Sequence, residues 1–411
     1  FTLNKALYQY MFTKVNFKYR DWGSIFRDTK NNSMSGVSNR NFTLLGDPSM
    51  LPPIASTELV VTSVTNLTSG SDTLKALAKV RINGVVRAQG VPDTGYQGTL
   101  VATLFDKRTP WTTLGDENSP FNFTAWDNVL FRGQASINNG QFTIDFVIPK
   151  SIDLAVGPGK LSLYASSNVN ERDAMGAGGT VKIGALEPNP GTDSRGPGVD
   201  VYMGDTTFIS GGLAGTDSRI VAILTDESGI DISNFNPQND ITAILDDTLS
   251  INLNSYYQAD IDNYRRGKVD YPIDGLAPGW HRLTLKAADT FGNAASSTIT
   301  FYVSDQKGIQ IEQWLNYPNP FSGSTTFHFK HNRSGEDLDV AVTVFDRMGK
   351  VVMASTYQVY ASSYKVDLPS WYGTLSDGTK LPEGLYLMKL SLRSLQDGTK
   401  NEKIAKVIIL N

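Results

Sequence analysis

The sequence predicts a mainly β protein, in which a short helical segment precedes three β-sandwich modules of the immunoglobulin-like kind. Apolar residues at helical spacing are confined to the first 30 residues. From about residue 54 the spacing changes to every second residue, as in Phe142, Ile144, Phe146 and Ile148. Gly, Pro, Asn and Asp interrupt these short runs at regular intervals, which is typical of β-sandwiches and barrels.

Residues 1–53 are predicted to hold two helices. The apolar face of the first comprises Leu3, Ala6, Leu7, Tyr10 and Met11, and that of the second Trp22, Ile25, Phe26 and Thr29. Asp21 is a candidate N-cap of the second helix. An Asn- and Ser-rich loop is expected over residues 31–41, followed by a short strand over residues 42–45. Pro52 and Pro53 favour extended geometry and mark the first domain boundary.

Three β modules are predicted, over residues 54–195, 196–308 and 309–411. Alternating apolar residues in the first occur at 74–82, where Leu77 interrupts the alternation, and at 161–165. A Pro- and Gly-rich loop or linker is expected over residues 187–198. The strand candidates of the other two modules are residues 220–224, 241–245, 283–287, 299–303, 327–329, 340–344, 386–392 and 404–410. Gly349 is expected to supply a positive φ in a hairpin loop over residues 345–350.

Composition excludes several functions. The 411 residues carry 37 Lys and Arg against 41 Asp and Glu, so no strong positive field favours nucleic acid or anionic membrane. The chain has no Cys, which excludes disulfides, thiolate zinc sites, Fe–S clusters and a cysteine nucleophile within these residues. No stretch reaches the roughly 18 apolar residues of a membrane helix. The first residues lack the features of a signal peptide, so we expect a fragment of a larger protein.

Histidines and acids offer few candidates for chemistry. His328 and His331 are three apart, so on a strand they point to opposite faces, and we expect solvent-facing side chains rather than a metal site. His281 could orient a carboxylate or simply flank a turn. Two groups of acids could contribute to a calcium site or be solvated turn residues: Asp246 with Asp247, and Asp260 with Asp262 and Asn263.

The remaining motifs are equally weak. Gly176, Gly178 and Gly179 resemble a phosphate cradle only in composition, because no helix is expected to follow them. The aromatic run from Trp111 to Trp126 could be a sugar-stacking platform or a long loop held by its aromatic residues. We therefore assign no catalytic, cofactor-binding or metal-ligating residue, and we expect no cofactor.

Three segments resemble a known family. Residues 39–48, from Asn39 and Arg40 to Pro48, resemble the closing motif of the caspase-like domain in gingipain-family cysteine peptidases. The last 95 or so residues are similar to the C-terminal domain that directs proteins through the type IX secretion system. Their motifs are Leu315–Phe321, Val342–Lys350, Trp371, Asp377–Gly378 and Leu381–Tyr386. Residues 245–247, 256–272, 276–281 and 287–293 resemble the cell-surface sortases of the gingipain family.

This resemblance implies a role at the cell surface, on the outer side of the outer membrane. The full-length sortase would cleave C-terminal signal domains from cargo and link the cargo to lipopolysaccharide. The present 411 residues would act as a spacer for the peptidase and would dock to the outer-membrane barrel PorV and other type IX components, without inserting into the membrane. The family's catalytic Cys and His lie upstream of the first motif, so no catalytic residue carries over and this chain is expected to be inactive alone.

Two other functions fit the same residues. The chain could belong to a secreted gingipain-like peptidase or adhesin whose last domain is cleaved off after export. It could also be a carbohydrate-binding adhesion module, and then substitution of Trp111 or Trp126 would abolish glycan binding. The end of the chain leaves open whether the C-terminal domain is retained or removed.

Overall fold

The computed structural model describes residues 2–33, 36, 41–116, 118–167, 169 and 171–410. The N-terminal part forms the two expected helices, α1 (Thr2–Met11) and α2 (Trp22–Ser33). Asp21 caps α2 as predicted, because its Oδ1 accepts a hydrogen bond from the Ser24 amide at 2.8 Å. Ile25 on α2 is fully buried.

The expected strand over residues 42–45 is wrong. These residues pair with no strand in the described part of the chain, and Leu45 is 92% exposed. An apolar run forms a strand only where a partner strand is available. Residues 37–40 of the expected loop, and with them Asn39 and Arg40 of the first motif, lie outside the described residues.

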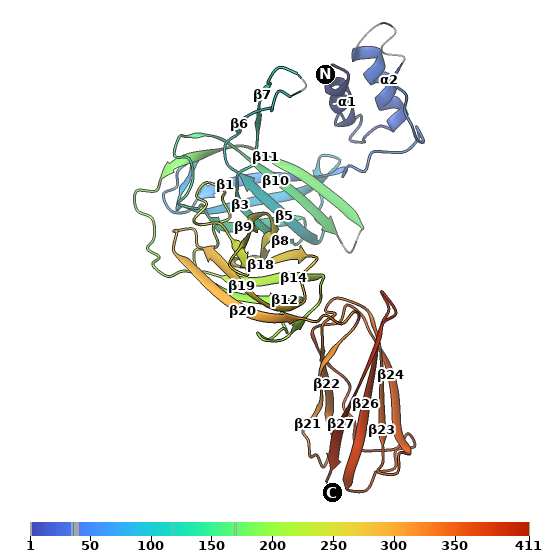
Figure 1. The fold of residues 1–411 in the computed structure, drawn as a ribbon. Helices are drawn as coiled ribbons and strands as arrows, with labels where there is room; N and C mark the ends of the chain where they lie inside the picture. The colour runs from blue at the N-terminus through green and yellow to red at the C-terminus, as the bar shows by residue number, and fades with distance from the viewer. Residues whose placement is uncertain are drawn as a thin grey trace. The chain divides into compact units, whose positions relative to one another are not determined.

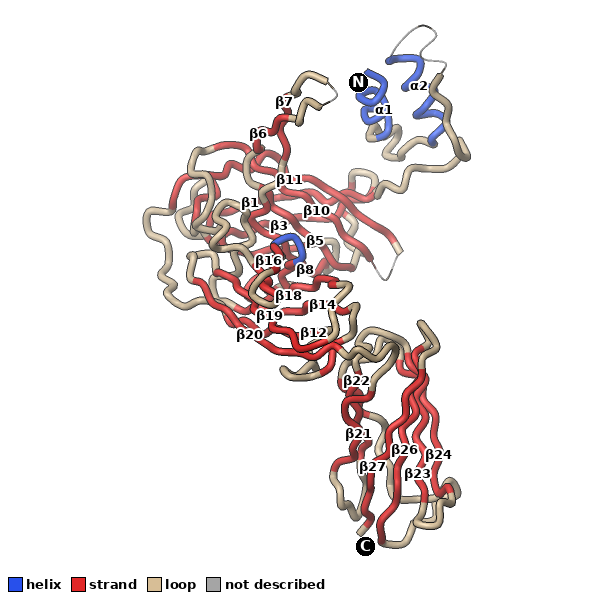
Figure 2. Tube along the Cα trace, viewed as in Figure 1, coloured by secondary structure: helices blue, strands red, loops and turns tan. Residues whose placement is uncertain are grey.

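From residue 57 on, the described residues form strands and connecting loops with one short 3-10 helix, which confirms the mainly β class with sandwich modules (Figures 1 and 2). By contacts the chain divides into two compact units. The first is residues 1–192 with 233–235 and 259–265, and the second is the remainder. Within the described residues, no helix has the length and apolarity needed to cross a membrane.

Apart from β6 and β7, which form a separate two-stranded sheet, the strands of the first unit belong to one large sheet that folds around a core. In the order β8-β5-β10-β11-β1-β3-β4 neighbours are hydrogen-bonded, while β9 pairs with β3, β2 pairs with β11 and β6 pairs with β7. The strands are β1 (Thr57–Asn66), β2 (Thr73–Ala76), β3 (Lys79–Ala88), β4 (Val91–Pro92), β5 (Gly98–Phe105), β6 (Thr109–Thr112), β7 (Asn122–Ala125), β8 (Val129–Ile137), β9 (Gln141–Val147), β10 (Gly157–Ser167) and β11 (Arg172–Leu186).

The interrupted alternation at Leu77 has a structural cause. Leu77 has a φ of 65°, which ends β2 and reverses the chain before β3 begins. The regular alternation of Phe142, Ile144 and Phe146 is confirmed in β9, where all three are buried and Phe146 stacks on Phe131 with ring centres 4.3 Å apart.

The second unit begins with two facing sheets, ordered β12-β14-β18 and β13-β20-β19-β15-β16. No helix or strand occurs over residues 187–197, in agreement with the expected loop. The elements are β12 (Gly198–Met203), β13 (Leu213–Ala214), β14 (Ser218–Thr225), β15 (Thr242–Leu245), β16 (Leu249–Asn252), the 3-10 helix η1 (Asn254–Tyr256), β17 (Tyr257–Ile261), β18 (Asn263–Ile273), β19 (Gly279–Ala288) and β20 (Ala294–Val303). Residues 259–265, at the end of β17 and the start of β18, are counted with the first unit.

The last hundred residues form a sandwich of a three-stranded sheet, β21-β22-β25, and a four-stranded sheet, β24-β23-β26-β27 (Figure 1). The strands are β21 (Ile311–Tyr317), β22 (Thr326–His331), β23 (Leu338–Phe345), β24 (Val351–Val359), β25 (Lys365–Asp367), β26 (Gly384–Ser394) and β27 (Lys400–Ile409). Between the sheets, Phe327 stacks against Trp314 and Trp371 at ring-centre distances of 5.5 and 5.8 Å. Gly349 has the predicted positive φ, at 81°.

The two edges of the four-stranded sheet differ. On the outer side of β27, the Asn319 side chain bonds the Lys406 carbonyl and the Ile408 amide, and Phe321 bonds Ile408 and Leu410 through its backbone. The strand β27 also carries four charged residues, Lys400, Glu402, Lys403 and Lys406. In contrast, β24 has no charged residue and no Pro, and within the described part of the chain it pairs on one side only. An unprotected edge of this kind is a template for another strand.

Candidate functional site

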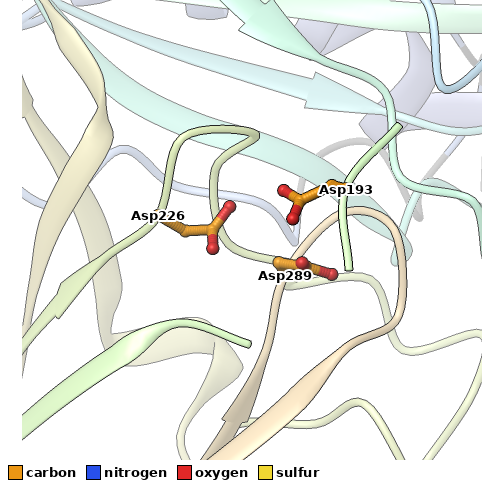
Figure 3. A group of neighbouring side chains, drawn as sticks. All are labelled: Asp193, Asp226 and Asp289. Atoms are coloured by element: carbon orange, nitrogen blue, oxygen red, sulfur yellow. The ribbon is translucent and has the colours of Figure 1, made fainter. Parts of the chain in front are cut away.

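Three aspartates from separate segments of the second unit come together as a cluster of carboxylates (Figure 3). Asp193 lies in the loop before β12, Asp226 directly follows β14, and Asp289 directly follows β19. One carboxylate oxygen from each lies within 4.8 Å of the others. Two of the three thus sit at the ends of strands whose positions the sandwich core fixes.

Backbone and side-chain donors orient the three carboxylates. Asp226 Oδ1 accepts the Ser228 amide at 2.8 Å, and Asp289 Oδ1 accepts the Asn293 amide at 2.8 Å. The Asn293 side-chain amide donates both to Asp289 Oδ2, at 2.7 Å, and to the Asp193 carbonyl, at 3.2 Å. Asp193 Oδ2 is buried without a hydrogen-bond partner. No Lys or Arg within the described residues forms an ion pair with any of the three.

The electrostatics of the cluster are unfavourable for three ionised groups. Burial raises the pKa of Asp226, and the nearby Asp289 and Asp193 carboxylates raise it further. Burial likewise raises the pKa of Asp289, with Asp193 adding to the effect. Carboxylate oxygens at this spacing are donors that a hard cation such as Ca²⁺ takes, so these three residues could hold one. None of the three was a candidate ligand from the sequence pattern, and the expectation of no metal site stays a prediction.

His328 and His331 lie on opposite faces of β22, as their spacing of three residues requires. His328 pairs with Asp367 on the neighbouring strand, with Nδ1 and Oδ1 2.6 Å apart. His331 faces the core and is fully buried, so the expectation that it faces solvent is wrong. Its Nε2 lies 2.9 Å from the Ser363 carbonyl, and its Nδ1 accepts the Arg333 amide at 3.1 Å. Burial lowers the pKa of His331 to about 4, so the ring is neutral at pH 7.

His281 orients a carboxylate, as the sequence allowed. Its Nδ1 lies 2.7 Å from Asp246 Oδ2, and its Nε2 lies 2.6 Å from the Ala277 carbonyl. Burial opposes protonation of this ring, but the two acceptors outweigh it and raise the pKa of His281. Asp247 pairs instead with Arg282. Asp246 and Asp247 are therefore each paired with a side chain of β19.

The other sequence candidates have structural roles. The Asp262 carboxylate accepts the Ser136 amide at 2.9 Å and the Ser136 hydroxyl at 2.6 Å. Gly176 and Gly178 lie within β11, where a Cβ on Gly176 would come within 2.0 Å of the Leu59 carbonyl oxygen. Close packing of neighbouring strands thus explains these glycines better than a phosphate cradle.

A buried polar network joins the last sandwich to the module before it. The Asp205 carboxylate accepts hydrogen bonds from the Tyr364 amide at 2.6 Å, from the Thr207 hydroxyl at 2.6 Å and from the Ser334 hydroxyl. Burial opposes the charge of Asp205, yet these donors outweigh it and lower its pKa.

Tyr364 and Glu312 extend the same network. Glu312 Oε2 accepts the Leu213 amide at 3.0 Å and the Tyr364 hydroxyl at 2.5 Å. The Tyr364 ring is almost fully buried and lies 5.0 Å from the ring of Phe208. A side chain on Gly212 would meet the Tyr364 hydroxyl at 2.3 Å, so only glycine fits there. We refer to Asp205, Phe208, Glu312, Ser334 and Tyr364 as the junction.

Comparison with known proteins supports the assignment of the last sandwich. Residues 316–409 match the family described as the secretion system C-terminal sorting domain. The chain therefore carries a sorting domain of the type IX kind over these residues, which links it to type IX secretion. No curated protein matches the sequence.

Three solved structures are similar over most of this chain. Dimeric latent PorU from Porphyromonas gingivalis is 27% identical, with a TM-score of 0.42, over 97% of this chain and 39% of that one. This chain thus spans about 39% of the length of that structure. The FN1-FN3 domains of chicken CNTN1 are 12% identical, over 86% of this chain and 98% of that one, with a TM-score of 0.19. A tetra-tandem repeat of a large adhesion protein is 12% identical, over 86% and 74%, with a TM-score of 0.20.

Proposed function

We propose that this chain is the non-catalytic C-terminal region of a PorU-like cell-surface sortase of the type IX secretion system. The full-length enzyme would be a cysteine peptidase that cleaves C-terminal signal domains from cargo and links the cargo to lipopolysaccharide. This region would space the peptidase from the outer membrane and dock it to the barrel PorV. Because these 411 residues contain no Cys, the nucleophile would lie in another part of the protein.

The junction carries this proposal. A sorting domain that is removed after export needs only a flexible connection to the rest of its protein. Here Asp205 and Leu213 of the preceding module bond to Tyr364 and Glu312 of the sorting domain, and Tyr364 is buried. Breaking such buried polar contacts leaves unpaired donors, so the two modules stabilise each other. That favours a sorting domain that is retained as a working part over one that is discarded.

The proposed division of the chain follows the sequence boundaries. Residues 1–53, with α1 and α2, would be the end of a caspase-like peptidase domain. Residues 54–195 and 196–308 would be spacer sandwiches, and residues 309–411 the docking domain. The unprotected edge of β24 supports the docking role, because a partner can add a strand there through backbone hydrogen bonds.

The test is the intact mass of the surface protein from its source cells, measured with and without a cysteine-directed covalent probe. We expect a mass well above 44.9 kDa, one labelled Cys, and residues 309–411 present in the mature protein. Loss of residues 309–411 would favour exported cargo with a cleavable domain. A mass equal to this chain without a label would contradict the sortase assignment.

A further inference from the structure

A pocket lies in the first unit where the β6–β7 hairpin leaves the sandwich. Its volume is about 730 Å³, which is within the usual range for small-molecule sites. Two aromatic side chains line it, Trp111 from the hairpin and Phe235 from a much later loop. They are 49% and 54% exposed, so both present ring surface to solvent.

Hydrogen bonds hold the Trp111 ring and the loop that carries Phe235. The Trp111 indole N–H donates to Asp127 Oδ2 at 2.6 Å, and the Thr109 hydroxyl donates to Asp127 Oδ1 at 2.6 Å. The loop that carries Phe235 is anchored because the Asn234 amide donates to Asn128 Oδ1 at 3.1 Å. The Trp111 ring and the backbone that carries Phe235 are therefore preorganised, which lowers the entropic cost of binding a ligand.

The charges around the pocket have partners within the protein. Lys107 Nζ donates to Asp106 Oδ1 and to the Asp153 carbonyl, both at 2.8 Å. The Arg108 guanidinium lies 3.7 Å from the centre of the Trp126 ring. With both cations engaged, an anionic ligand would have to break existing interactions. This arrangement also covers the Trp126 ring, so Trp111 is the aromatic platform of the run that the sequence singled out.

We propose that this pocket binds a neutral saccharide. One face of a sugar ring carries C–H groups that pack on an aromatic surface, and its hydroxyl groups both donate and accept hydrogen bonds. Trp111 and Phe235 supply the aromatic surface, while Asp127 and Asn128 supply oxygen and amide groups at the rim. This binding site is separate from the proposed docking role and does not depend on it.

The test uses the full chain and an immobilised panel of neutral hexose and N-acetylhexosamine oligosaccharides, with uronic-acid oligosaccharides as the charged comparison. We expect binding to at least one neutral oligosaccharide, weakened at least tenfold by Trp111→Ala and by Phe235→Ala. Trp111→Phe keeps an aromatic ring and should retain part of the affinity. The matched control is Phe121→Ala, because Phe121 is 63% exposed near the same hairpin but does not line the pocket.

Three results would overturn the proposal. The first is that the wild-type chain binds no neutral oligosaccharide, and the second is that it binds only the charged ones. The third is that Trp111→Ala and Phe121→Ala bind equally well. Thermal unfolding of each variant, measured alongside, separates loss of the site from loss of the fold.

Discussion

Replacing Asp205 with Ala should loosen the sorting domain from the module before it. The substitution removes the acceptor of the Tyr364 amide, at 2.6 Å, and of the Ser334 hydroxyl. Each half-buried donor left without a partner costs about 1–3 kcal/mol, so we expect a loss of about 3 kcal/mol at the junction. Since 1.4 kcal/mol is a factor of ten, local opening should become roughly 100-fold more frequent.

Hydrogen exchange measured by mass spectrometry on peptides that contain Tyr364 and Lys365 reads this opening directly. The control is Asp377→Ala, since Asp377 also accepts an amide hydrogen bond, from Thr379, but in an exposed turn. It should leave exchange at Tyr364 unchanged. If Asp205→Ala exchanges at the wild-type rate in these peptides, the junction does not hold the two modules together.

Four further predictions follow from the contacts described above. Asp226→Asn should raise the free energy of unfolding by about 1 kcal/mol in the presence of a chelator, because it removes one of three crowded carboxylates. Calorimetry in EDTA measures this change. No gain in stability would contradict repulsion among the three carboxylates. The raised pKa of His281 stabilises the fold below about pH 6.5, and this stabilisation is lost as the pH rises through the pKa of the folded state. Solvent screening should keep it below about 1 kcal/mol. His281→Gln should remove this pH dependence in denaturant melts measured across a pH series. The pH dependence that His331 contributes to stability has the opposite sign, because burial lowers its pKa to about 4 in the folded state. The free energy of unfolding should therefore fall by about 3 kcal/mol from pH 7 to pH 4. His331→Gln should remove most of this fall. Thr356→Lys places a charge on the open edge of β24. If the sorting domain docks to PorV as proposed, this variant should bind purified PorV at least tenfold more weakly, whereas Lys406→Thr on β27 should not; equal effects would exclude β24 as the docking edge.

The sequence was most informative where a structure is local. The alternation of Phe142, Ile144 and Phe146 sufficed to predict β9, and Gly349 sufficed for its hairpin. The interruption at Leu77 was also visible, although only the structure gives the positive φ as its cause. Residues 42–45 were mispredicted because apolar character alone does not supply a partner strand.

The candidate sites depend on contacts that spacing cannot reveal. Asp193, Asp226 and Asp289 each look like an ordinary turn acid, and only the sandwich brings their oxygens within 4.8 Å. In the same way, Phe235 joins Trp111 in one pocket although no local pattern connects them. The burial of His331 follows from the strand next to it and from the loop at Ser363, neither of which its own neighbours predict.

The unequal edges of the four-stranded sheet limit how many partners can add to it. If both edges were open, each added strand could offer a new edge, and molecules could join head to tail into a growing fibre. Here the Asn319 side chain and the charged residues of β27 prevent a further strand from pairing with the outer edge of β27. One strand can add at β24, and growth cannot continue through the opposite edge of the same domain. Even at high protein concentration, this geometry favours one-to-one complexes over polymers.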